Sequence, residues 1–156
     1  MELEIDDWRF WVNIDATRKH TVQNASDHCR CSYCKNYYET ALLSFPELGP
    51  FFNLFGIDFY GPSEIMPFEH DYVLVCYRVY GSILQWGSNP LQINGITVLP
   101  EISDYESFFL WIGEMELPWI QDESPEDVVS PANLPEFLER MQEIWKLRHE
   151  SESILC

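Results

Sequence analysis

Positive charge is scarce in this sequence. Its 156 residues include 9 Lys plus Arg against 26 Asp plus Glu, which gives a formal net charge of −17. A field of this sign repels nucleic-acid phosphates and anionic membranes and attracts basic partners. We therefore expect neither direct nucleic-acid binding nor membrane binding, although solubility alone is a second explanation of the charge.

Long apolar runs and a secretion signal are also lacking. No run approaches the roughly 20 apolar residues that cross a bilayer. Residues 1–7 are rich in acids and lack the basic flank and apolar stretch of a signal peptide. We expect a cytoplasmic protein, in which the five cysteines are reduced thiols or metal ligands rather than disulfides.

Known catalytic motifs are absent as well. The sequence has no Gly-x-Ser-x-Gly, no phosphate-binding glycine loop and no His-Glu-x-x-His, and its four histidines are scattered. Glu114 and Glu116 share one face of an expected strand, as a hydrolase would need, but in so acidic a chain nothing distinguishes this pair. The sequence predicts a protein that is not an enzyme.

Apolar content, by contrast, is sufficient for a core. Hydrophobic residues make up 46% of the chain and aromatic residues 15%, which fits one folded domain over residues 1–156. Residues 8–15 alternate between apolar and polar, which predicts a half-buried strand. Residues 16–27 are polar, with slightly more basic than acidic side chains. This composition predicts a loop that contains at most a short strand at residues 21–23.

Two helices are expected next. Residues 33–45 carry aromatic and apolar side chains at helical spacing, which predicts an amphipathic helix with Ser32 as its N-cap. Residues 46–55 begin with proline and precede Gly56, a natural left-handed C-cap. This pattern predicts a second, short helix.

A run of strands follows these helices. Residues 71–86 give the strongest strand pattern, with Gly81 at a bulge or bend. Residues 91–99 form one strand, or two that turn at Asn94-Gly95, because Asn-Gly is typical of tight hairpins. Residues 107–116 form the last long strand.

The order of these elements predicts an α+β fold, because the strands follow one another without helices between them. We expect a twisted antiparallel sheet with a two-helix insertion after the first strand, both within residues 1–120. Residues 121–132 contain a run of acids and predict a solvated linker. Residues 133–150 have apolar side chains at helical spacing and predict an amphipathic C-terminal helix.

Three of the five cysteines lie within six positions of one another. With the histidine beside them they offer four zinc ligands, which are His28, Cys29, Cys31 and Cys34. Zinc prefers four nitrogen or sulfur donors, often as two Cys-x-x-Cys pairs, and here the second pair is missing. A redox-active thiol pair before a helix is one alternative. Simple packing, with Cys34 in the core and the others in a tight turn, is another. The sequence favours no bound cofactor, and zinc is the one candidate.

Aromatic residues exceed what a core of this size needs, with six Trp and eight Tyr. Aromatic side chains flanked by acids are good anchors for a basic partner surface. An aromatic-rich core is the alternative at each position. The candidate partner-binding residues are Trp11, Trp86, Tyr105, Trp111, Glu114, Glu116, Trp119, Asp122 and Glu123.

Three blocks of sequence carry a resemblance. They are residues 28–38 (HCRCSYCKNYY), residues 55–58 (FGID) and residues 117–119 (LPW). Together they resemble a group of small bacterial and phage-borne proteins over roughly residues 8–120. The group has no established activity, so the resemblance implies a gene neighbourhood rather than a chemistry.

These features predict a non-enzymatic inhibitor of a basic protein partner, such as a toxin or nuclease effector. The class would be an immunity protein, an antitoxin or a phage counter-defence protein, whose carboxylates mimic phosphates and steer the encounter. The alternative function is a zinc-stabilised or thiol-redox module centred on Cys29, Cys31 and Cys34.

Overall fold

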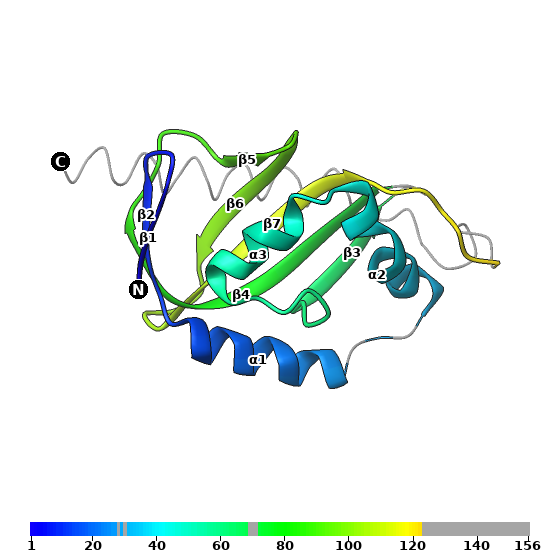
Figure 1. The fold of residues 1–156 in the computed structure, drawn as a ribbon, viewed down its shortest axis with the longest axis horizontal. Coiled ribbons are helices and arrows are strands. Elements are labelled where there is room, and N and C mark those ends of the chain that lie inside the picture. The colour runs from blue at the N-terminus through cyan, green and yellow to red at the C-terminus, as the bar shows by residue number, and fades with distance from the viewer. Residues whose placement is uncertain (28, 30, 69–71, 123–156) are drawn as a thin grey trace.

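The structure, a computed structural model, describes residues 1–27, 29, 31–68 and 72–122 and confirms the α+β class. Figure 1 shows a twisted sheet with helices on one side of it. Along the chain the elements are β1 (Glu2–Ile5), β2 (Trp8–Val12), α1 (Ile14–Ser26), α2 (Ser32–Ser44), α3 (Leu48–Phe55), β3 (Glu64–Phe68), β4 (Tyr72–Gln85), β5 (Leu91–Ile93), β6 (Ile96–Ile102) and β7 (Ser107–Glu116).

The sheet is built around β4, its longest strand among the described residues. The strand order is β1-β2-β4-β7-β6-β5, every pairing is antiparallel, and β3 also pairs with β4. One edge of β4 pairs with β7, whereas its other edge pairs with β3 near its start and with β2 near its end. The β-branched and aromatic composition of β4 favours this central position.

The core lies between the sheet and the helices (Figure 1). Aromatic rings from α3 meet rings from the strands: Phe55 lies 5.4 Å from Phe10, and Phe52 lies 4.8 Å from Tyr77, measured between ring centroids. All four side chains are buried. Burial stabilises each by about 1.5–3 kcal/mol, so much of the aromatic surplus is core.

Helix α1 corrects the sequence-based expectation of a loop at residues 16–27. The Asn13 side chain caps the helix by accepting the Ala16 N–H at 3.0 Å. The helix buries two threonine hydroxyls rather than an apolar stripe. Thr17 Oγ1 accepts the Tyr80 N–H, and Thr21 Oγ1 accepts the Asp58 N–H, both at 2.9 Å. α1 thus covers the stretch of the β4 edge between β2 and β3. Because the inner face of α1 is polar, the sequence shows no apolar residues at helical spacing there.

Other boundaries also differ from the expectation. The strand expected over residues 8–15 ends at Val12. β1, in which exposed Glu2 and Glu4 alternate with partly buried Leu3 and Ile5, was not predicted. The insertion contains three helices and follows two strands. Cys31, rather than Ser32, is the N-cap of α2.

Several local predictions are confirmed. Gly56 ends α3 in the left-handed conformation, with φ 77°. Asn94 and Gly95 join β5 to β6 with φ values of 49° and 84°, as a type I′ hairpin requires. Gly81 has φ 152°, and β4 bends there from its pairing with β7 toward β2.

Most of the expected linker at residues 121–132 and the whole expected helix at residues 133–150 lie outside the described residues. Within the described part of the chain, no helix is long and apolar enough to cross a membrane.

Candidate metal centre at the start of helix α2

Three thiols meet where α2 begins. The Sγ atoms of Cys29, Cys31 and Cys34 all lie within 4.8 Å of one another. Cys29 and Cys31 are exposed and Cys34 is buried. Zinc–sulfur bonds of about 2.3 Å in a tetrahedron place sulfur atoms about 3.8 Å apart, so a modest contraction suffices for binding. These three cysteines can hold a metal ion.

The cluster follows from the local backbone. Cys31 occupies the N-cap position with extended φ and ψ of −64° and 159°, and its Sγ accepts the Cys34 N–H at 3.5 Å. The Cys31 N–H in turn donates to Cys29 Sγ at 3.4 Å. The first turn of a helix has unpaired N–H groups and a positive partial charge, which favour thiolates over thiols.

The thiols differ in ionisation. Hydrogen bonds from the backbone N–H and then the side chain of Cys31 lower the pKa of Cys29. Burial first, and then the hydrogen bond and charge of Cys31, raise the pKa of Cys34 well above that of an ordinary thiol. The cluster therefore combines an exposed thiol that ionises readily with a buried thiol that stays protonated. A bound cation would reverse the shift at Cys34 by stabilising its thiolate.

Helix α2 is firmly anchored behind the cluster. Asn36 is buried and clamps the chain after β7: its Nδ2 donates to the Pro118 carbonyl at 3.0 Å, and its Oδ1 accepts the Ile120 N–H at 2.9 Å. The Tyr33 hydroxyl donates to the Tyr72 carbonyl at 2.5 Å. The thiols thus extend from a helix end that packing and hydrogen bonds hold in place.

Three of the four predicted ligands come together, and the fourth, His28, lies outside the described residues. The other histidine and cysteine among the described residues, His20 and Cys76, do not belong to the group. His20 lies against the Tyr80 ring at 5.5 Å, and Cys76 is buried in β4. Among the described residues, the cluster offers three ligands.

The predicted partner-binding aromatics are spread over the molecule. Trp86 packs at 5.3 Å from Trp8, and Trp119 at 6.1 Å from Tyr33, between ring centroids. The Trp111 indole donates to Glu101 at 2.8 Å. These three tryptophans are partly buried, and their rings contact the fold itself.

The other predicted partner-binding residues are more exposed. Trp11 is 43% exposed and Tyr105 91% exposed. The remaining members, Glu114, Glu116 and Asp122, are exposed, and Glu123 lies outside the described residues.

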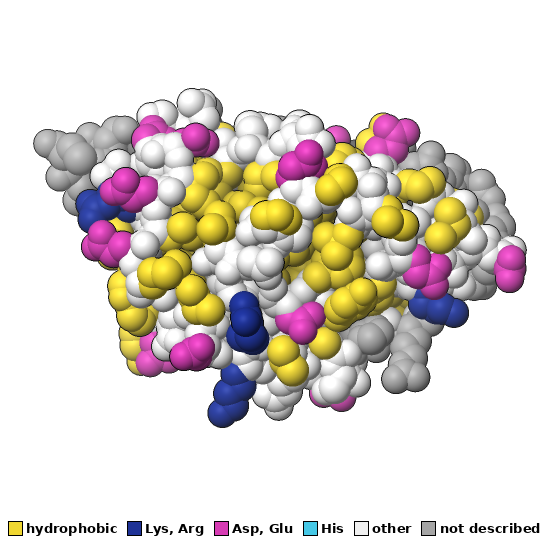
Figure 2. Space-filling model, viewed as in Figure 1, with side chains coloured by type: hydrophobic (Ala, Val, Ile, Leu, Met, Phe, Trp, Pro, Cys, Tyr) yellow, Lys and Arg dark blue, Asp and Glu magenta, His cyan; other side chains and the backbone are white. Residues whose placement is uncertain are grey.

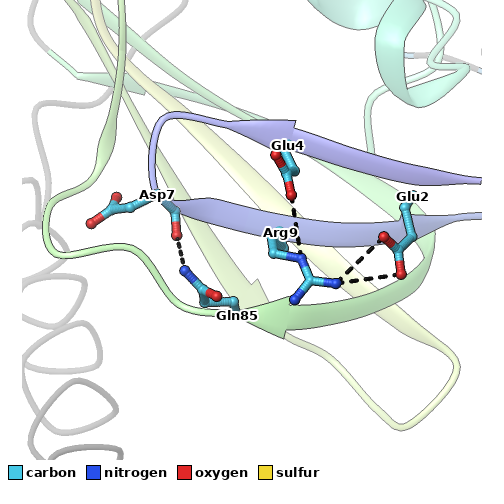
Figure 3. A network of polar contacts seen from close by, with 5 residues as sticks. All are labelled: Glu2, Glu4, Asp7, Arg9 and Gln85. Carbon is cyan, nitrogen blue, oxygen red and sulfur yellow. Dashed lines mark hydrogen bonds and ion pairs between the residues drawn. The ribbon is translucent and has the colours of Figure 1, made fainter.

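Trp11, on β2, lies beside acidic side chains of β1. It is directly opposite Glu2 in the register of the two strands, so the two side chains are neighbours on one face. Figure 3 shows Glu2 and Glu4 converging on Arg9, at 3.4 Å and 3.6 Å between side-chain nitrogen and oxygen. The Asp7 backbone carbonyl accepts from the Gln85 side-chain amide at 2.8 Å, which ties this hairpin to β4. We call Glu2, Glu4 and Trp11 the hairpin patch.

Fold and site together define an α+β protein with three clustered thiols at a helix N-terminus. Comparison with family models, with curated proteins and with solved structures found no match.

Proposed function

We propose that the protein binds zinc as a Cys29–Cys31–Cys34 thiolate complex, and that the ion stabilises the junction between α1 and α2. The observation that carries this proposal is the placement of three Sγ atoms within 4.8 Å at the start of α2. Thiolate sulfur is a preferred zinc donor, and the helix N-terminus helps the thiols to ionise.

The surroundings favour capture of a cation. Two of the three thiols are exposed, which gives the ion a path to the cluster. The net charge of −17 raises the local concentration of cations around the molecule. His28, next to Cys29 in sequence, or a water molecule completes the tetrahedron in this proposal.

Metal analysis tests the proposal directly. Protein purified without added zinc is expected to retain about one zinc ion per chain, and a chelator is expected to lower its melting temperature. The double variant Cys31→Ser, Cys34→Ser should lose the metal, whereas Cys76→Ala should retain it, since Cys76 is not part of the cluster. Absence of metal together with unchanged melting of the double variant would overturn the proposal.

A thiol-redox role is the alternative for the same cluster. Cys31 and Cys34 form a Cys-x-x-Cys pair at a helix N-terminus, as redox motifs do. In a glutathione buffer series, metal-free protein that forms a Cys31–Cys34 disulfide reversibly would support this alternative. Zinc-loaded protein that resists oxidation would support the metal site.

A second candidate function is inhibition of a basic protein partner, in the manner of an immunity protein, an antitoxin or a phage counter-defence protein. The hairpin patch favours it, because an exposed indole lies among carboxylates on a strongly acidic chain. Carboxylates would steer a toxin or nuclease effector toward the patch, and Trp11 would slow its release.

Binding kinetics test this second candidate with the product of the neighbouring gene as the probe. Glu2→Gln, Glu4→Gln should slow association and reduce its salt dependence, whereas Trp11→Ala should speed dissociation. Asp15→Asn, Glu106→Gln is the matched control, because it removes the same two charges from exposed positions elsewhere. Binding that is insensitive both to salt and to these acidic substitutions would exclude the inhibitor role for the patch.

A further inference from the structure

A cavity opens on the helix-covered face of the sheet. It has a volume of about 430 Å³, and α1, α2, α3 and residues 57–60 all contribute to its lining. In Figure 2 the same face shows apolar side chains gathered over α3, with basic side chains nearby at the position of α1. The volume lies within the range of about 300–1,000 Å³ that is typical of small-molecule sites.

The floor of the cavity is apolar and held in place. Phe52 and Phe59 are buried, and their ring centroids lie 6.1 Å apart. The Phe59 carbonyl accepts the buried Tyr77 hydroxyl at 2.6 Å, which fixes the loop that carries this ring. Tyr60 packs against Phe59 at 5.1 Å and is about half exposed. Because Phe52 and Phe59 are only 1% and 7% exposed, a ligand with an apolar body would contact mainly Leu42 and Tyr60, which line the same cavity.

Two opposite charges line the same cavity. Arg18 comes from α1, and Asp58 comes from the loop after α3. Asp58 Oδ1 accepts the Tyr60 N–H at 2.9 Å, and the Asp58 N–H donates to Thr21 at 2.9 Å, so the carboxylate has a defined position. Among the described residues, neither side chain takes part in an ion pair. The cavity thus offers a cation and an anion that do not form an ion pair with each other.

We propose that this cavity binds a zwitterionic small molecule with an apolar body, of the class of hydrophobic dipeptides. Its carboxylate pairs with Arg18, whose planar guanidinium suits two-point binding of a carboxylate. Its ammonium group pairs with Asp58, and its side chains contact Leu42 and Tyr60. The Asn53 amide, also on the lining, is placed for a peptide group. This inference is independent of the zinc proposal, because no cysteine of the cluster lines the cavity.

Titration of the full-length protein with L-leucyl-L-phenylalanine, followed by amide NMR shifts, tests the proposal. Saturable shifts are expected at Gly49, Asn53 and Tyr60, which line the cavity. N-acetylation or C-terminal amidation of the dipeptide each removes one charge and should weaken binding about tenfold, the equivalent of one charge-assisted hydrogen bond.

Matched variants test which side chain binds each end of the ligand. Arg18→Gln should abolish the preference for the free carboxylate, and Asp58→Asn should abolish the preference for the free ammonium group. Lys19→Gln, the neighbour of Arg18 that does not line the cavity, should change neither. Absence of saturable shifts at millimolar dipeptide would overturn the proposal. So would equal affinity for the free and capped forms, or tighter binding of the amide, which would indicate a simple cation instead.

Discussion

At the scale of single residues, Cys29 and Cys34 belong to one cluster, but their pKa values are shifted in opposite directions. The hydrogen bond from the Cys31 N–H lowers the pKa of Cys29, whereas burial raises the pKa of Cys34. Burial likewise raises the pKa of Cys76 well above that of an ordinary thiol. Ionisation and exposure together determine thiol reactivity, so the order of reaction can be derived from the structure.

We expect iodoacetamide to alkylate metal-free protein first at Cys29 and last at Cys34 and Cys76, as measured by peptide mass mapping over time. The Cys29 thiolate should appear at lower pH than that of an ordinary thiol, so its advantage should grow as the pH falls toward neutrality. Stoichiometric zinc should slow the reaction at Cys29 and leave Cys76 unchanged. Equal rates at Cys29 and Cys34 would contradict the assigned environments.

A second residue-scale feature is a chain of buried phenols. The Tyr77 hydroxyl donates to the Phe59 carbonyl at 2.6 Å, and the Tyr37 hydroxyl lies 2.7 Å from that of Tyr77. Because Tyr77 donates its only proton to Phe59, Tyr37 is the donor in the second bond. Burial raises the pKa of both phenols, so both stay protonated and the chain persists over the ordinary pH range.

Tyr77→Phe should lower the free energy of unfolding by about 1–3 kcal/mol, because it leaves a buried carbonyl and the Tyr37 hydroxyl without their partner. Tyr37→Phe should cost less, since Tyr77 keeps its bond to Phe59. Urea unfolding of both single variants and of the double variant gives the coupling energy. Additive effects would show that the two phenols act independently.

At the scale of elements, Gly81 permits the contact between β2 and β4. Glycine adopts its φ of 152° readily, whereas residues with a side chain rarely do. A Cβ added there would also lie 2.0 Å from the Trp11 carbonyl oxygen. That oxygen belongs to the backbone and cannot move without disturbing the strand pairing of Trp11 with Ser82. The sequence indicates a special position here, and the close approach explains it.

Gly81→Ala should lower the free energy of unfolding by about 1–3 kcal/mol or more, from backbone strain and the contact with β2. Gly49→Ala is the matched control: it lies in α3, and a Cβ there meets nothing within 4 Å. That control should be neutral or stabilise the protein by up to about 1 kcal/mol. Chemical denaturation of both variants provides the comparison, and equal effects would refute the steric explanation.

At the scale of the whole molecule, charge is the dominant global property. A net charge of −17 on 156 residues destabilises the compact state through self-repulsion. Most ion pairs among described residues, such as Arg9 with Glu2, are exposed and contribute little to stability. Added salt should therefore act mainly by screening repulsion.

We expect the melting temperature to rise with sodium chloride, most steeply at low concentration, because the screening length is about 8 Å at 0.15 M ionic strength and longer below it. Scanning calorimetry over a salt series measures the rise, and sucrose of equal osmolality is the control. A melting temperature that stays flat or falls with salt would show that ion pairs outweigh repulsion.

Local patterns in the sequence determined the elements that depend on neighbouring residues. The strand β4, the hairpin at Asn94-Gly95 and the helix α2 follow from periodicity and turn chemistry within short windows. The thiol cluster was predictable for the same reason, since its three cysteines lie within six positions and one helix start brings them together.

Only the tertiary structure decided what depends on distant partners. α1 is stabilised by hydroxyl contacts with Tyr80 and Asp58, so its helix has no apolar signature in the sequence. β1 has only four residues, and its pairing with β2 and the packing of Leu3 and Ile5 against the core define it as a strand. The opposed charges of Arg18 and Asp58, forty positions apart, line one cavity only because α1 and the loop after α3 pack together. Long-range packing brings together residues that are far apart in the sequence, and local sequence patterns do not predict such contacts.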